Sequence, residues 1–205
     1  MTRLAIGAIA LATAVIAAFG ITRLTANRPR VVGATVNGAP AAPDFTLIDH
    51  HGRQIALHEL RGKTVALTFI YTHCPDVCPL IASTLGTADR RLGAQGAKVE
   101  LLAVSVDPAG DTPLSVQKFN ADRGLADLAN WHYLTGSPSQ LAKVWQVYGG
   151  IEDPALAGKA VTPDQLAHLA IVYLIDPQGR LRVALPSNFS ASDFLQDVQA
   201  ISQSA

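Results

Sequence analysis

Apolar positions along the chain follow two periods, one typical of strands and one typical of helices. Short apolar runs rich in Val, Ile, Thr and aromatic residues, the pattern of buried strands, occupy 64–70, 98–106, 131–134 and 168–175. Apolar residues three and four positions apart predict helices over 79–92, 113–123, 137–148 and from Ser190 or Ser192 to about Ile201. This alternation predicts a mixed α/β sheet flanked by helices.

Turn and cap residues divide these elements. Thr112 and Pro113 suit the cap and first position of the helix predicted over 113–123. Gly149-Gly150 is expected to end the helix predicted over 137–148. Apolar residues at 44–48 and 54–57 predict a hairpin with Gly52 in its turn, in which His50 and His51 are solvated. An irregular stretch, 151–164, precedes the strand that begins at His168, and a turn over 176–179 leads to a last strand over 180–185.

The first thirty residues differ from all the others. Leu4 to Ile21 carries no charge and is 18 residues long, the lower limit for a membrane span. A cleaved secretory signal is the alternative, because Ala18-Phe19-Gly20 offers small residues at the two positions that signal peptidase needs. We therefore predict an anchor or signal over 1–22, a linker over 23–43 and one folded domain over 44–205.

Charge bears on topology and on partners. Three arginines follow the predicted span and one precedes it, so the positive-inside rule favours a cytoplasmic domain. We nevertheless expect the domain to face the periplasm, anchored to the inner membrane or released by cleavage, because long domains cross largely regardless of flanking charge. Residues 31–205 hold 12 basic and 16 acidic residues, with no basic stripe among aromatics, which argues against nucleic acid.

The two cysteines of the chain, Cys74 and Cys78, directly follow the apolar run 64–70. They are predicted to lie in a strand-to-helix turn, where the helix N-terminus favours the thiolate that attacks disulfides and binds metal. A purely structural disulfide is a poor alternative, because a five-residue loop gives only about 2 kcal/mol. Met1 is the single methionine, so the domain offers no thioether ligand.

Four motifs together resemble the Sco/SenC family of copper-binding, thioredoxin-like proteins, over roughly residues 43–203. They are Tyr71-Thr72-His73-Cys74-Pro75-Asp76-Val77-Cys78-Pro79, then Val104-Ser105-Val106-Asp107-Pro108 with Asp111-Thr112-Pro113, then Tyr133-Leu134-Thr135-Gly136, and His168 ahead of Asp176-Pro177-Gln178-Gly179. A cysteine pair at this spacing is weak evidence by itself. With the other three motifs at family spacing it is specific.

The resemblance implies a thioredoxin-like fold and a copper site, for Cu(I) or Cu(II), formed by Cys74, Cys78 and His168. Soft thiolates select Cu(I), and imidazole suits copper as well. It also implies delivery of copper to the copper-bearing subunit of a respiratory cytochrome c oxidase, with other copper carriers as further partners. The chain departs from the family beside His168, where Ala167 and Leu169 replace the common Asp and Ser or Thr. An Asp there orients the imidazole, so its absence bears on Cu(II) affinity.

A second hypothesis is an enzyme, a thiol-disulfide reductase in which Cys74 and Cys78 are the catalytic pair. Such reductases normally use C-x-x-C, and the extra residue together with a distant histidine favours copper delivery. Both roles can coexist, since the cysteines of a partner's copper site must be reduced before metal enters. Of the neighbouring residues, His73 is expected to be an exposed bystander, Asp76 to discourage thiolate or pair with a partner's lysine, and Asp107 and Asp111 to shape the adjacent loop.

Overall fold

The computed structural model describes residues 30–152 and 170–202. Val31–Ala205 forms one compact unit. The predicted anchor over 4–21 and the predicted ligand His168 lie outside the described ranges. Among the helices within those ranges, none is long and apolar enough to cross a membrane.

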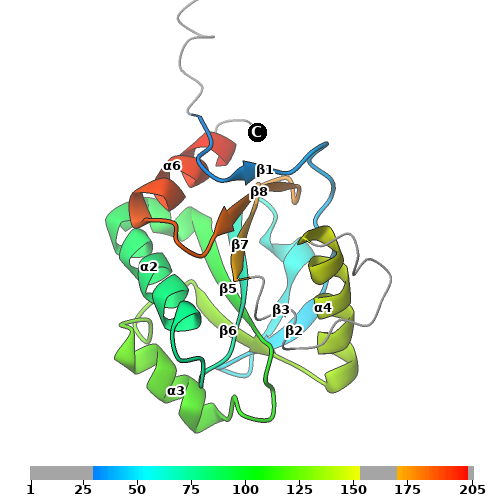
Figure 1. Cartoon of the computed structure of the whole chain (residues 1–205), viewed down its shortest axis with the longest axis vertical. Coiled ribbons are helices and arrows are strands. Elements are labelled where there is room, and N and C mark those ends of the chain that lie inside the picture. The colour runs from blue at the N-terminus through cyan, green and yellow to red at the C-terminus, as the bar shows by residue number, and fades with distance from the viewer. Residues whose placement is uncertain (1–29, 153–169, 203–205) are drawn as a thin grey trace, which may run out of the picture. The chain divides into compact units, whose positions relative to one another are not determined.

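One eight-stranded sheet runs through the domain in the order β1-β8-β7-β4-β5-β6-β2-β3 (Figure 1). The central strands β4, β5 and β6 are parallel, and every other neighbouring pair is antiparallel. The strands are β1 Ala34–Thr35, β2 Thr46–Asp49, β3 Gln54–Ala56, β4 Thr64–Ile70, β5 Val99–Ser105, β6 Trp131–Thr135, β7 Ile171–Ile175 and β8 Leu181–Pro186. This confirms the predicted mixed α/β architecture.

Helices cover both faces of the sheet. On one face lie α2 Val77–Leu92, α3 Pro113–Asp122 and α6 Ala191–Ser202, and on the other lies α4 Pro138–Glu152 (Figure 1). Two 3-10 turns, η1 Leu57–Leu60 and η2 Gly93–Lys98, complete the described elements. Parallel strands need crossover connections, and α2 and α3 provide those between β4 and β5 and between β5 and β6.

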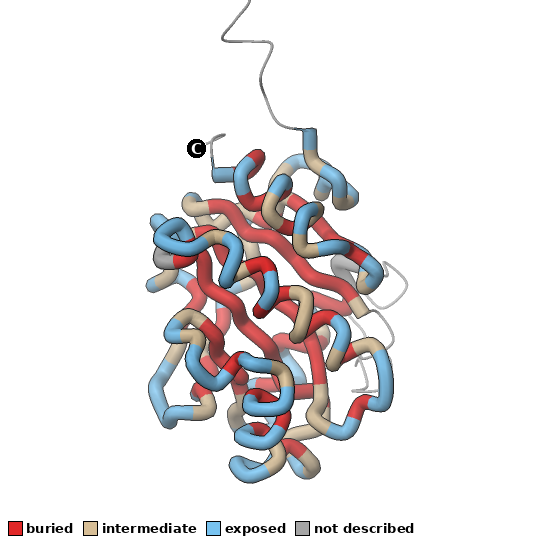
Figure 2. Tube along the Cα trace, turned by 90° about the vertical axis from the view of Figure 1, so that its left-hand side faces the viewer, coloured by how far each residue is buried: buried red, intermediate tan, exposed pale blue. Residues whose placement is uncertain are grey.

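The core consists of two apolar layers, one on each side of the sheet. All seven residues of β4 and of β5 are buried, because both strands lie in the centre of the sheet and are covered by helices on both faces (Figure 2). Successive residues of β5 alternate between the layers: Leu101 packs with α2, whereas Leu102 packs with α4. Both tryptophans, Trp131 and Trp145, are buried in these layers, as the sequence suggested.

Three sequence predictions need correction. Residues 31–42 are not a linker, because β1 pairs with β8 and Ala41 bridges to Arg180. The buried carboxylate of Asp197 on α6 also accepts the backbone N–H groups of Val32, at 2.5 Å, and Gly33, at 2.9 Å. Helix α4 does not end at Gly149-Gly150 but continues to Glu152. Strand β7 begins at Ile171, because Ala170 before it has a φ of 42°.

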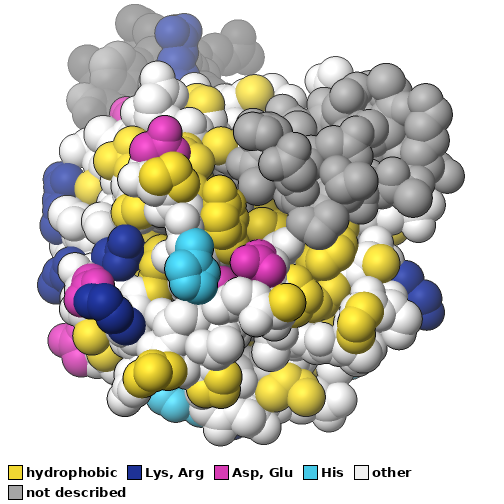
Figure 3. Space-filling view, turned by 60° about the horizontal axis from the view of Figure 1, so that its bottom comes forward, with side chains coloured by type: hydrophobic (Ala, Val, Ile, Leu, Met, Phe, Trp, Pro, Cys, Tyr) yellow, Lys and Arg dark blue, Asp and Glu magenta, His cyan; other side chains and the backbone are white. Residues whose placement is uncertain are grey.

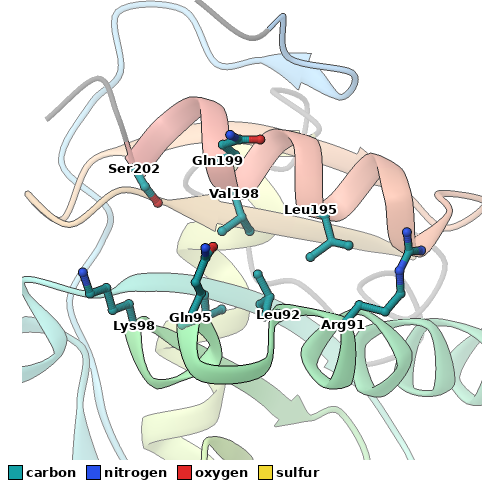
Figure 4. Close-up of a pocket in the computed structure, with 9 residues that line it drawn as sticks. Arg91, Leu92, Gln95, Lys98, Leu195, Val198, Gln199 and Ser202 are labelled. Carbon is teal, nitrogen blue, oxygen red and sulfur yellow. The ribbon is translucent and has the colours of Figure 1, made fainter.

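A groove of about 540 Å³ separates α6 from the end of α2 and the following turn (Figure 4). Leu195 and Val198 point into it from α6 and Leu92 from the end of α2, and Arg91 and Lys98 lie at its two ends. None of its lining residues is a cysteine or histidine. The groove is therefore separate from the candidate site described next.

Candidate metal centre

The two cysteines lie where β4 leaves the sheet and α2 begins. The chain turns after Ile70, with the backbone N–H of Cys74 donating to the carbonyl of Tyr71 at 3.3 Å, and α2 starts at Val77. The carboxylate of Asp76 caps the helix by accepting the N–H of Val77. The helix begins two residues before its predicted start, so Cys78 is in its first turn and Cys74 is in the loop before it.

Both cysteines are free, and their side chains lie close together. The backbone N–H of Cys78 donates to the sulfur of Cys74 at 3.3 Å. Cys78 is 1% exposed and Cys74 is 7% exposed, and both belong to the layer formed by α2, α3 and α6. A ligand or a partner sulfur therefore reaches Cys74 first.

Burial changes the expected chemistry of Cys78. Desolvation raises the pKa of its thiol well above the usual range, and the adjacent Cys74 and the negative charge of Asp111 raise it further. The sequence predicted the opposite, a helix N-terminus that favours thiolate. The helix dipole is worth at most about 2 kcal/mol, and here the cost of burying an anion exceeds it.

A buried carboxylate, Asp111, supports the loop that carries the cysteines. Its Oδ1 accepts the backbone N–H of Thr72 at 2.8 Å. Its Oδ2 accepts the hydroxyls of Ser105 at 2.5 Å and Tyr133 at 2.7 Å. Burial and the charge of Asp111 raise the pKa of Tyr133, so this phenol remains a neutral donor. One side chain thereby joins the cysteine loop, β5 and β6, as the sequence suggested for Asp111 in general terms.

Asp107 and His73 both lie close to Gly110 beside this network. The carboxylate of Asp107 accepts the N–H of Gly110 at 3.1 Å, and the exposed ring of His73 lies 3.2 Å from the hydroxyl of Thr72. A Cβ on Gly110 would lie 2.1 Å from Asp107 Oδ2 and 3.3 Å from His73 Nδ1, so a larger residue would require these side chains to shift. Figure 3 views this face, where acidic and histidine side chains lie among hydrophobic ones.

The described residues supply two of the three predicted metal ligands. Cys74 and Cys78 lie together, whereas His168 falls outside the described ranges. Within those ranges no group of three His, Cys, Asp or Glu side chains is arranged to hold a metal ion. The exposed ring of His73 lies 3.2 Å from the hydroxyl of Thr72. The donor set that remains, two adjacent thiols, suits a soft ion such as Cu(I).

A second polar cluster lies at the other end of the central strands, and the sequence analysis missed it. His132 is 5% exposed, with Nδ1 3.1 Å from Asp49 Oδ2 and Nε2 3.0 Å from Glu100 Oε2. Arg53 pairs with Asp49 at 2.8 Å and Lys63 with Glu100 at 2.5 Å. We call these five residues the charged end, and Cys74, Cys78, Asp111 and their contacts the cysteine end. Polar residues inside the apolar runs 98–106 and 131–134 were the available signal.

Comparison with known proteins identifies the family. The SCO1/SenC family model matches residues 33–203. The chain belongs to this family. The SCO1 protein homolog of Bacillus subtilis is 29% identical over 161 residues, which cover 77% of this chain and 81% of that protein. Protein SCO2, mitochondrial, of Saccharomyces cerevisiae is 30% identical over 182 residues, which cover 87% of this chain but 57% of the yeast protein.

Solved structures of Sco proteins have the same fold. BsSco, described as a member of the Sco family of cytochrome c oxidase assembly proteins with a disulfide switch, is 26% identical, with a TM-score of 0.64. The match covers 84% of this chain and 98% of BsSco. Bradyrhizobium japonicum ScoI, solved with copper bound, is 23% identical, with a TM-score of 0.59 over 80% of this chain and 99% of that one. These matches support the thioredoxin-like, Sco-type fold that the sequence predicted.

Proposed function

We propose that this protein binds copper through Cys74 and Cys78 and delivers it to the copper-bearing subunit of a respiratory cytochrome c oxidase. The observation that carries the proposal is the pair of free cysteines on one strand-to-helix turn, with the sulfur of Cys74 3.3 Å from the backbone nitrogen of Cys78. Two soft donors held side by side favour Cu(I) over the harder ions of the periplasm.

The relatives support this reading. ScoI of Bradyrhizobium japonicum and Sco1 of yeast have been solved with copper bound, and BsSco is described as a cytochrome c oxidase assembly protein. The chain covers most of the Bacillus relative, whereas it spans little more than half of the yeast SCO2 protein. Copper binding and oxidase assembly are therefore proposed here for the domain that the family model matches.

Copper must displace the proton of the buried Cys78 thiol. Burial opposes a free thiolate at Cys78, so the anion forms favourably only when a cation arrives to neutralise it. Copper binding by the reduced protein should accordingly release protons. The thiol of Cys78 therefore stays protonated until the metal binds.

We further propose that His168 is the third ligand, because of its place in the family pattern. His168→Ala should weaken Cu(II) binding far more than Cu(I) binding, since imidazole contributes more to Cu(II) sites, and should leave disulfide formation between Cys74 and Cys78 intact. His58→Ala is the matched control, because the ring of His58 is half-exposed and pairs with Asp44 at 2.9 Å. Unchanged Cu(II) spectra in His168→Ala would remove it as a ligand and make His73 the next candidate.

Copper titration of the full chain tests the main proposal. The reduced protein should bind one Cu(I) tightly, and the protein oxidised to the Cys74–Cys78 disulfide should not, because a disulfide offers no thiolate. Equal affinity in both redox states would place the metal elsewhere and contradict the proposal.

A thiol-disulfide reductase is the second candidate, favoured by the adjacent cysteines and the greater exposure of Cys74. The thiolate of Cys74 would attack a partner's disulfide, break that S–S bond and form a mixed disulfide. Cys78 would then attack Cys74, release the partner's second thiol and form the Cys74–Cys78 disulfide. Cys78→Ser separates the candidates: a reductase would accumulate the mixed disulfide, whereas a copper carrier would lose its metal and trap no partner.

The proposed location is the periplasmic side of the inner membrane, with residues 4–21 as the anchor. Protease added to spheroplasts should digest the domain while the N-terminus stays with the membrane. A cleaved, soluble domain in the periplasmic fraction would favour the secretory signal instead. Protection of the domain until the membrane is permeabilised would reverse the proposed topology and support the cytoplasmic location that the flanking arginines favour.

A further inference from the structure

Asp111 belongs to the smaller group of buried carboxylates that have neutral partners. Asp49, Glu100 and Asp176 each pair with an arginine or lysine. Asp197 accepts two backbone N–H groups at the other side of the domain, whereas Asp111 lies beside the cysteine loop. All three partners given for Asp111 are neutral, namely one backbone N–H and two hydroxyls. Within the described ranges its hydrogen bonds are thus satisfied, whereas its negative charge is not balanced by a bonded cation.

The two described loops next to Asp111, 71–80 and 106–116, add no lysine or arginine. They do contain Asp76 and Asp107, so this end of the domain is negative. A buried, unbalanced anion is costly, which is why most are paired in folded proteins.

The position of Asp111 relative to the cysteines suggests what compensates it. Its Oδ1 holds the N–H of Thr72, one residue after Tyr71, whose carbonyl in turn accepts the N–H of Cys74. The other oxygen is fixed by Ser105 and Tyr133, which belong to the central strands β5 and β6. The loop that carries Cys74 is thereby tied to the rigid part of the sheet, and the Asp111 carboxylate is bonded to this loop only two residues before Cys74.

We propose that Asp111 is a positioning residue that fixes the turn before Cys74 and supplies a fixed negative charge that favours Cu(II) over Cu(I) at the cysteine pair. This inference rests on the proposed copper site and adds to it a determinant of the oxidation state held. A fixed anion attracts a divalent ion more strongly than a monovalent one at the same position. Asp111 therefore raises the Cu(II) affinity more than the Cu(I) affinity.

The test compares Asp111→Asn with the wild-type full chain. Asparagine keeps the shape and an oxygen that can accept the N–H of Thr72, and it removes the charge. Dissociation constants for Cu(I) and Cu(II) are measured by competition with chelators of known affinity. The ratio of Cu(II) affinity to Cu(I) affinity should fall by about tenfold or more, the effect expected of one nearby charge. A ratio within about twofold of wild type would overturn the role of the charge.

Two further variants separate charge from structure. Tyr133→Phe removes one hydrogen-bond donor and keeps the carboxylate of Asp111. The ratio of Cu(II) affinity to Cu(I) affinity should therefore stay at or above the wild-type value. A fall like that of Asp111→Asn would overturn the proposal. Asp122→Asn is the matched control, an exposed carboxylate on α3 paired with Lys118 at 2.9 Å. It should change neither affinity, because solvent screens its charge.

Hydrogen exchange in the copper-free protein tests the positioning role independently of metal. Peptides covering 71–78 should exchange faster in Asp111→Ala, which removes the acceptor of the Thr72 N–H, and in Tyr133→Phe to a smaller extent, than in wild type or Asp122→Asn. Unchanged exchange in both Asp111→Ala and Tyr133→Phe would refute the positioning role. If the wild-type chain bound no copper, the proposed function and the charge role would fail together, whereas an unchanged ratio in a copper-binding wild type would refute this inference alone.

Discussion

The cysteine end and the charged end of the central strands are both buried and polar, yet their charges are arranged differently. At the charged end, Asp49 and Glu100 alternate with Arg53, His132 and Lys63, so each carboxylate has a cationic partner. At the cysteine end, Asp111 has neutral donors and stands beside two thiols. A network in which every charge is paired contributes to the stability of the folded state alone. A network with an unpaired negative charge can bind a positive ion reversibly.

The largest expected effect separates the two ends by copper binding. Cys74→Ser or Cys78→Ser should abolish tight Cu(I) binding, a loss of at least about a hundredfold, because each variant removes one of two soft ligands. The free energy of unfolding should change by less than about 2 kcal/mol, since serine is nearly isosteric and hydroxyl burial is the main cost. Chelator competition and denaturant unfolding measure the two quantities. Wild-type affinity in both variants would place the metal elsewhere.

The second prediction breaks the charged end instead. His132→Ala should lower the free energy of unfolding by about 3 kcal/mol, because it removes the group between two buried carboxylates. Copper affinity should not change. His58→Ala is the control, and its half-exposed pair with Asp44 should be worth less than about 1 kcal/mol. A His132→Ala protein as stable as this control would show that the charged end contributes little to stability.

The third prediction concerns acid stability at the charged end. Burial would raise the pKa of Asp49, but hydrogen bonds from Arg53 and His132 outweigh it and lower that pKa to about 2. An unfolded aspartate titrates near 4, so the unfolded state binds more protons between these values and stability falls from about pH 4 to pH 2. Asp49→Asn should make the plot of the unfolding midpoint against pH less steep in this window. An equally steep curve in the variant would contradict this assignment.

His50 defines a second acid window beside the first. Burial, together with the charge of His51, lowers the pKa of His50 to about 4, and its Nδ1 accepts the N–H of Tyr133 at 3.2 Å. An unfolded histidine titrates near 6.5, so acidification from about pH 6.5 to pH 4 should destabilise the fold. His50→Asn, which keeps an acceptor that does not titrate, should remove this slope and leave the slope below pH 4. His50 thus lies in the predicted turn, but it is half-buried, whereas its neighbour His51 is exposed as expected.

Local patterns in the sequence predicted the elements that position the cysteines. Strand β4 has the predicted bounds, because an apolar run of seven residues suits a strand buried on both faces. Thr112 caps α3 as expected, since its hydroxyl accepts the N–H of Ser115. Both are determined by neighbours in the chain.

Features that depend on distant residues were not predicted. Residues 31–35 show no periodicity, yet Asp197, more than 160 positions away, binds them to α6. Helix α4 passes two glycines that cost about 1 kcal/mol each, because tertiary packing overrides local propensity. The hydroxyls bound to Asp111 come from β5 and β6, and no spacing in the sequence reveals that they meet.

The smallest expected effect tests whether structure alone explains the cysteine end. Thr112→Ala removes the cap of α3, next to Asp111, and should cost about 1 kcal/mol of stability. Because the carboxylate of Asp111 remains in place, the ratio of Cu(II) to Cu(I) affinity should stay within about twofold of wild type. Denaturant unfolding and chelator competition measure the two effects on the same protein. A tenfold fall in the ratio would mean that displacement of the loop, and not the charge of Asp111, sets the oxidation state that the site prefers.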